Sequence, residues 1–176
     1  MQMEELSALI AEAGTDVYRF CVKLTGNRED ADDLYQETFL WAVERHHKID
    51  LAQNPRAFLL SVAMKRFQSQ KRRWARRNRI APHVPLLEAQ ELFRGEGMED
   101  VLAREDAFGQ VRQVVNELSE RYRIPVYLYY TLEMDIASIA QVLQVPAGTV
   151  KSRLHKARRL IQQKLEAQQD EKTGLI

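Results

Sequence analysis

The sequence predicts an all-α protein of two small helical domains joined by a flexible linker, with a helix-turn-helix in the second domain. Apolar residues recur every three or four positions through most of the chain, and no segment alternates with the period of a β-strand. A stretch rich in proline, glycine and acids separates two periodic halves. The expected domains are residues 1–80 and 104–168, with the linker at 81–103 and a polar tail at 169–176.

The composition suits compact helical cores. Hydrophobic residues make up 45% of the 176 residues and charged residues 29%, unlike a disordered chain. The single cysteine, Cys21, forbids an intramolecular disulfide and lies in an apolar run, so we expect a buried structural thiol. The start of the chain has acids and no basic segment, and no apolar run reaches the length of a membrane span. We therefore expect a cytoplasmic protein that does not insert into membranes.

The net charge of +1 conceals a strong segregation of charge. Residues 65–79 hold many bases and no acid, whereas acids prevail in residues 88–106. Local patches, more than net charge, attract phosphates, so a nucleic-acid partner is compatible with this composition.

Two helices are expected at the start of the chain. Residues 3–24 are apolar at helical period, and Gly26 should end that helix. Asn27 is a natural cap for the next helix. Its apolar positions are Ala31, Leu34, Tyr35, Thr38, Phe39, Ala42 and Val43.

The other face of this second helix mixes acids with large apolar groups. It consists of Asp33, Gln36, Glu37, Leu40, Trp41 and Glu44. Exposed leucine and tryptophan beside acids favour a protein partner with an apolar centre and a basic rim. The alternative is that Trp41 packs under a neighbouring helix, and the sequence leaves both open.

A third helix should start at Asn54 and Pro55. Its first turns carry core-type residues at Phe58, Leu59, Val62 and Ala63. Farther along this helix, aromatic residues are interleaved among basic residues: Lys65, Arg66, Phe67, Lys71, Arg72, Arg73, Trp74, Arg76 and Arg77. Such a surface can stack on unpaired bases while its cations hold the backbone. The alternative is a solvated basic helix end with one buried tryptophan.

The second domain should begin with two helices. An apolar stripe of Phe108, Val111, Val114, Val115 and Leu118 marks the first of them. Ser119 is the expected cap of the second, which should run to Leu132, with Pro125 only bending its start.

Residues 135–165 have the layout of a helix-turn-helix. Asp135 is an N-cap, residues 144–146 form the turn, and Pro146 suits the start of a longer helix with an apolar stripe from Val150 to Leu165. The candidate DNA-binding residues on its other face are Thr149, Lys151, Ser152, Arg153, His155, Lys156, Arg158 and Arg159. In such a motif base readers lie near the start of the second helix and phosphate contacts farther along. The alternative is a solvated basic face on an ordinary helical hairpin.

The two basic surfaces together suit a protein that binds duplex DNA at one point and an opened DNA strand at another. The strings DDLYQETF at residues 32–39 and PAGTVKSRLHKAR at residues 146–158 carry a family resemblance. With their surroundings they resemble the second and fourth conserved regions of bacterial sigma-70-type factors, in that order and spacing. Because only these two regions are present, the chain resembles the small extracytoplasmic-function (ECF) class.

The resemblance implies partners for each surface. The acidic helix, through Asp33, Gln36, Glu37, Leu40 and Trp41, would bind the clamp helices of the largest RNA polymerase subunit. The basic residues from Lys65 to Arg77 would bind the −10 element and the melted non-template strand. Lys151, Ser152, His155 and Lys156 would read the −35 element, with Arg153, Arg158 and Arg159 as phosphate or packing positions. The resemblance also implies contact with the polymerase flap, a cognate anti-sigma factor, and a linker whose acidity mimics nucleic acid.

Three positions depart from the family pattern. Lys65 stands where many relatives have an asparagine that captures a flipped base, which leaves the readout of that base open. Ser138 replaces a glutamate that often completes the capping box, and Gln144 replaces the usual turn glycine.

Two other classes of function compete with the interpretation as a sigma factor. A dimeric helix-turn-helix regulator that binds an operator without core polymerase is the alternative, and it would need a dimerisation surface and a palindromic site. An enzyme is not expected, because the chain has no P-loop, no GxSxG and no CxxC motif. The four histidines show no metal-ligand spacing, so neither a metal nor a cofactor is expected.

Overall fold

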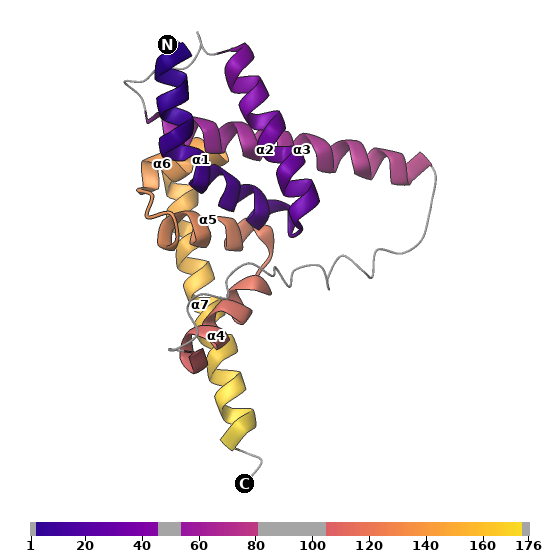
Figure 1. The fold of residues 1–176 in the computed structure, drawn as a ribbon. Helices are drawn as coiled ribbons and strands as arrows, with labels where there is room; N and C mark the ends of the chain where they lie inside the picture. The colour runs from indigo at the N-terminus through magenta and orange to yellow at the C-terminus, as the bar shows by residue number, and fades with distance from the viewer. Residues whose placement is uncertain (1–2, 46–53, 81–104, 174–176) are drawn as a thin grey trace. The chain divides into compact units, whose positions relative to one another are not determined.

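The computed structural model describes residues 3–45, 54–80 and 105–173, and the regular elements in these ranges are all α-helices (Figure 1). The predicted all-α fold is confirmed. In chain order the helices are α1 Met3–Thr25, α2 Arg28–Glu44, α3 Pro55–Ile80, α4 Glu105–Asn116, α5 Glu120–Tyr130, α6 Ile136–Leu143 and α7 Ala147–Thr173. The expected connector before Asn54 and the acidic linker lie outside the described residues.

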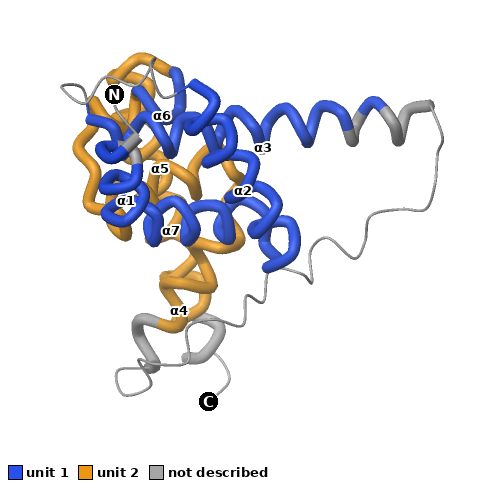
Figure 2. Tube along the Cα trace, turned by 45° about the horizontal axis from the view of Figure 1, so that its top comes forward, with its two compact units in different colours: residues 1–95, 141–144 blue, residues 96–140, 145–176 orange. Residues whose placement is uncertain are grey.

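The chain divides into two compact units, one of residues 1–95 with 141–144 and the other of residues 96–140 with 145–176 (Figure 2). The domain boundaries expected at residues 80 and 104 fall at the edges of the described ranges and stay predictions. Each unit has its own core of buried apolar side chains.

In the first unit, α1, α2 and α3 all pack against one another. Their core includes Val17, Phe20, Leu34, Leu59 and Leu60, each fully buried. The expected stripe of α2 is buried at Ala31, Leu34, Thr38 and Ala42. Val43, which the periodicity placed in this stripe, is 37% exposed, so that expectation is wrong. Val43 occupies the edge of the stripe, where coverage depends on a neighbouring helix.

Local signals set the helix ends of this unit as expected. Gly26 follows α1 in the left-handed region at φ 80°. The Asn27 side-chain oxygen accepts from the Asp30 N–H at 2.8 Å, and that of Asn54 accepts from the Ala57 N–H at 3.0 Å. Cys21 is buried, and burial raises the pKa of its thiol to about 12, as suits an inert structural cysteine.

In the second unit, α4 and α5 pack against α7. Val114, Leu118, Leu128, Val150 and Leu154 are buried there. Two expectations for this unit are wrong. Val111 is 38% exposed, so it does not belong to the buried face of α4. Ser119 occupies the expected N-cap position of α5, but its side chain makes no capping hydrogen bond; its carbonyl accepts from the N–H groups of Tyr122 and Arg123, both at 2.9 Å.

Arg123 is buried in the second unit, which no pattern in the sequence predicted. Its side chain is 7% exposed, and Nη1 donates to the carbonyl of Asn116, the last residue of α4, at 3.0 Å. Desolvation lowers the pKa of Arg123. A cation at the carboxyl end of α4 complements the helix dipole and satisfies a carbonyl that the helix leaves open.

Candidate nucleic-acid interface

The N-terminus of α6, the first helix of the helix-turn-helix, is capped by two hydrogen bonds between Asp135 and Ser138. Asp135 Oδ1 accepts from the Ser138 N–H, and Ser138 Oγ donates to Asp135 Oδ2, both at 2.8 Å. These bonds favour the charged carboxylate and lower the pKa of Asp135. Ser138, only 7% exposed, therefore anchors the cap at the position where a glutamate would complete a capping box.

The turn between α6 and α7 keeps its geometry without a glycine. Gln144 adopts φ 54°, and its N–H donates to the carbonyl of Gln141 at 3.3 Å. The Val145 N–H donates to the carbonyl of Ala140 at 3.1 Å. This pair of bonds is a Schellman motif, and it holds a residue with a side chain in the left-handed region at a cost of about 1 kcal/mol. Gln144, which stands in place of the usual turn glycine, is therefore accommodated by strain in the turn and not by another type of turn.

Helix α7 presents the expected cations on the side away from its core. Val150, Leu154 and Ala157 are buried. The exposed candidate residues are Lys151, Ser152, His155, Lys156, Arg158 and Arg159, while Thr149 and Arg153 are half-buried. The Ser152 hydroxyl donates to the carbonyl of Thr149 at 2.9 Å, so its oxygen still offers lone pairs outward. The Nε of Arg153 is buried without a hydrogen-bond partner, which fits a packing position better than a reader.

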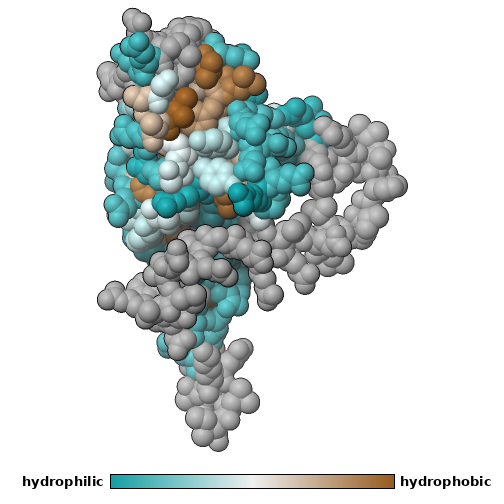
Figure 3. All heavy atoms as spheres, in the orientation of Figure 1, coloured by the Kyte–Doolittle hydropathy of each residue, from teal (hydrophilic) through white to brown (hydrophobic). Residues whose placement is uncertain are grey.

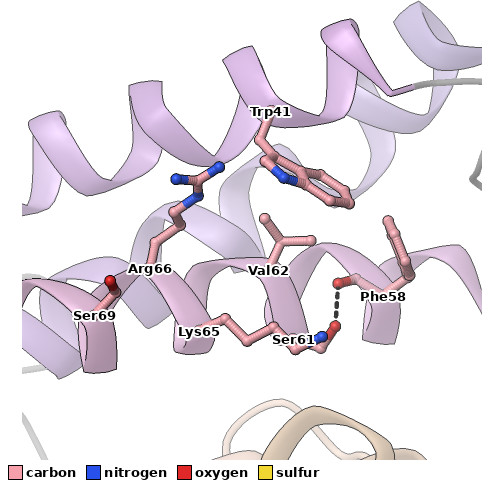
Figure 4. A pocket seen from close by; sticks show the side chains of 7 residues that line it. All are labelled: Trp41, Phe58, Ser61, Val62, Lys65, Arg66 and Ser69. Atoms are coloured by element: carbon pink, nitrogen blue, oxygen red, sulfur yellow. Dashed lines mark hydrogen bonds between the residues drawn. The ribbon is translucent and has the colours of Figure 1, made fainter.

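In the first unit, α2 and α3 form a pocket of about 240 Å³. Figure 4 shows its lining residues: Trp41, Phe58, Ser61, Val62, Lys65, Arg66 and Ser69. The indole of Trp41 lies 5.8 Å from the Phe58 ring, centroid to centroid, and Arg66 extends toward it across the pocket (Figure 4). Trp41 from the acidic helix therefore lines the same pocket as Lys65 and Arg66 from the basic helix, a combination that the sequence had assigned to separate surfaces.

For Trp41, packing against a neighbouring helix does not exclude contact with a partner. The side chain is half-buried, packs against Phe58 of α3, and still lines the pocket. The Arg45 guanidinium lies 5.2 Å from the centroid of its ring system. A half-buried indole that lines a pocket can stack on a further planar group.

Phe67 does not belong to the exposed basic surface of α3. It is 8% exposed, which contradicts the expectation that its ring stacks on bases. Lys65, Lys71, Arg72, Arg73 and Arg76 are exposed and Arg66 is half-buried. The side chains of Trp74 and Arg77 lie outside those that the structure describes, so their expected DNA contacts stay predictions.

The acidic face of α2 is open at its centre. Leu40 is 60% exposed, beside exposed Asp33 and Gln36 and half-buried Glu37. Figure 3 shows hydrophobic surface at the upper end of the first unit, where α2 ends in the matching view of Figure 1. An exposed leucine of this degree within acids and amides suits a protein contact.

Two features are missing from the part of the chain that the structure describes. None of its helices combines the length and apolar character needed to cross a membrane. No group of three or more histidine, cysteine, aspartate or glutamate side chains in the described ranges could hold a metal ion.

Comparison with known proteins covers both units. Residues 9–78 match the family model described as Sigma-70 region 2, and residues 108–161 match that described as Sigma-70, region 4. The chain is 30% identical over 162 residues to the ECF RNA polymerase sigma factor SigL of Mycobacterium tuberculosis, covering 92% of this chain and 89% of the relative. It is 25% identical over 154 residues to the ECF RNA polymerase sigma factor SigW of Bacillus subtilis, covering 85% and 82%.

Two solved structures share the fold. The sigma factor RpoE of Bartonella quintana, in complex with the anti-sigma factor NepR, superposes with a TM-score of 0.75 at 20% identity, covering 93% of this chain and 98% of that one. CnrH, in complex with the cytosolic domain of CnrY, superposes with a TM-score of 0.64 at 20% identity, covering 94% and 90%.

Proposed function

The chain belongs to the ECF group of the sigma-70 family of RNA polymerase sigma factors, and from this premise we propose how its two units divide promoter recognition. A sigma factor binds core RNA polymerase and directs it to promoter DNA, where transcription starts. The alternative of a dimeric operator-binding regulator is not favoured, because the match to region 2 adds a whole unit that a helix-turn-helix regulator does not need.

The observation that carries the proposal is the two-sided character of α7. Val150, Leu154 and Ala157 are buried, while Lys151 and Lys156 are exposed on the other side of the helix. We assign this face to the −35 duplex. Ser152 and His155 lie among the exposed residues of the first turns and would reach base edges, and Arg159 farther along would reach phosphates.

The pocket between α2 and α3 is the proposed holding site for one unpaired base of the −10 element. Trp41 and Phe58 supply aromatic surface, and Lys65 and Arg66 supply charge for the backbone. Stacking of a base on such a ring contributes about 1–3 kcal/mol. Lys65 offers only donors, so it would favour a base edge with acceptors, unlike the asparagine of many relatives.

The face of α2 around Leu40 is the proposed contact with the clamp helices of the largest polymerase subunit. Its exposed apolar centre and acidic surroundings suit a basic partner surface. An anti-sigma factor, such as the NepR that is bound to the similar sigma factor RpoE, would hold this chain inactive by covering its binding faces. The chemistry of RNA synthesis belongs to the polymerase in this scheme.

Reconstitution with core RNA polymerase tests the proposal. The full-length chain is mixed with core enzyme, passed over a size-exclusion column, and used in run-off transcription on genomic fragments. We expect comigration with core enzyme and initiation at a limited set of promoters. A chain that elutes as its own dimer and binds a palindromic site without core enzyme would refute the proposal.

A further inference from the structure

Arg158 of α7 is held by the end of α5. Its Nε donates to the Tyr130 hydroxyl at 2.8 Å. The guanidinium carbon lies 5.8 Å from the centroid of the Tyr130 ring and 5.9 Å from that of Tyr129. The two rings stand edge to face, at 78° and 4.9 Å between centroids. Two differently oriented rings and one hydroxyl therefore restrain a single guanidinium.

The charge of Arg158 remains available to an external anion. The side chain is exposed, and within the described ranges no carboxylate forms an ion pair with it. Arginine carries five N–H donors, of which the contact with Tyr130 uses only the one on Nε. The two terminal nitrogens keep theirs. Lys164, farther along the same helix, differs because it is paired with Glu117.

We infer that Tyr130 is a positioning residue that presents the Arg158 guanidinium to a phosphate of the DNA backbone. The inference rests on the proposed binding of duplex DNA by α7. A long arginine side chain loses much rotamer freedom when it binds, and a contact made beforehand reduces that loss. The terminal nitrogens form a planar fork that matches two phosphate oxygens.

A phosphate fits this position better than a base edge. Arg158 lies C-terminal to Lys151, Ser152, His155 and Lys156, the exposed residues of the first turns of α7. In a helix-turn-helix the base contacts come from the start of the second helix, and backbone contacts flank them. A guanidinium fixed to the end of α5 would therefore set the register of α7 on the duplex without reading sequence.

A purely structural link between α5 and α7 is the competing explanation. The two helices already pack through buried residues such as Leu128 and Leu154, whereas Tyr130 is 55% exposed. A contact on so exposed a rim adds little to packing. The structural explanation predicts a change in stability without a change in DNA affinity, and this difference makes the two separable.

The test compares two conservative variants of the full-length chain. Tyr130→Phe removes the hydroxyl that holds Arg158 and keeps the ring. Tyr129→Phe is the matched control, because the Tyr129 hydroxyl makes no hydrogen bond within the described ranges. Binding to a short fluorescent duplex of arbitrary sequence is followed by anisotropy across a salt series, with thermal unfolding in parallel.

We expect Tyr130→Phe to weaken duplex binding about threefold to tenfold and Tyr129→Phe to leave it unchanged. Arg158→Ala should weaken binding at least as much and reduce the salt slope by about 1, since one phosphate contact is lost. In the Arg158→Ala background, Tyr130→Phe should then have no further effect.

Two results would overturn the inference: an unchanged affinity of the Tyr130→Phe variant, or an equal loss with and without Arg158. A failure of the proposed role of α7 looks different. In that case the double variant Lys151→Ala, Lys156→Ala would bind the duplex as tightly as the parent chain.

Discussion

The two units each carry a cationic helix, but α7 and α3 use their charge differently. Helix α7 separates a buried apolar stripe from an exposed basic face, so its proposed binding surface is one side of a single regular helix. Helix α3 buries Phe67 within its basic stretch and shares a pocket with Trp41 of α2. Duplex DNA is regular and fits a regular helix, whereas an unpaired base needs a recess that only two helices together can form.

The largest expected effect removes the polymerase contact from the first unit and leaves α7 intact. Glu37→Lys with Leu40→Asp should lower affinity for core polymerase by at least about a hundredfold, as for a central interface residue. Run-off transcription should be lost while anisotropy still detects duplex binding. The control is Glu29→Lys, an exposed acid in the first turn of the same helix. Normal comigration of the double variant with core enzyme would reject this interface.

The basic face of α7 gives the next largest effect. Lys151→Ala with Lys156→Ala should weaken promoter binding about tenfold to a hundredfold and lower the salt slope by about 2, because fewer counterions are released. Lys164→Ala is the control, since its charge is already paired with Glu117. A salt slope that stays at the parent value would argue against phosphate contacts by these lysines.

The pocket in the first unit should affect strand opening and not initial binding. Trp41→Leu keeps apolar packing against Phe58 but removes the stacking surface, and should reduce opening about tenfold. Permanganate reactivity of exposed thymines measures opening, and gel shifts measure the closed complex. Lys71→Ala, on α3 but outside the pocket lining, is the comparison. An equal loss of the closed complex would mean that Trp41 serves assembly instead.

The cap at Asp135 gives a smaller and pH-dependent effect. Asp135→Ala should cost about 1 kcal/mol of unfolding free energy at neutral pH. Because folding lowers the pKa of Asp135, its contribution is present above the ordinary value of 3.8 and is lost as the pH falls through the lower, folded value. Urea unfolding of both proteins over this range should show the difference narrowing with acid. A constant difference would show that the carboxylate charge is irrelevant.

The smallest effect concerns the turn between α6 and α7. Gln144→Gly should raise the unfolding free energy by up to about 1 kcal/mol, because glycine adopts positive φ without strain. Gln141→Gly, within α6, should lower it by about 1 kcal/mol. Opposite signs in chemical unfolding would support a strained turn, whereas destabilisation by both would contradict it.

Local signals in the sequence were sufficient for the starts of α2, α3 and α6 and for the division of α7 into two faces. Asn27, Asn54 and Asp135 each cap the helix that their position predicted, through bonds spanning three residues. The family strings at residues 32–39 and 146–158 were likewise readable from the chain alone, and the family match confirms the reading.

Only the tertiary structure decided which neighbour covers each helix face. Packing buries Phe67 and Arg123, leaves Val43 and Val111 exposed, brings Trp41 to the pocket of α3, and holds Arg158 by Tyr130. The physical reason is that periodicity fixes the direction in which a side chain points relative to its own helix, while burial and partners depend on residues far away in sequence. The sequence therefore determined the helices and the family, and the packing of helices determined the pocket and the orientation of Arg158.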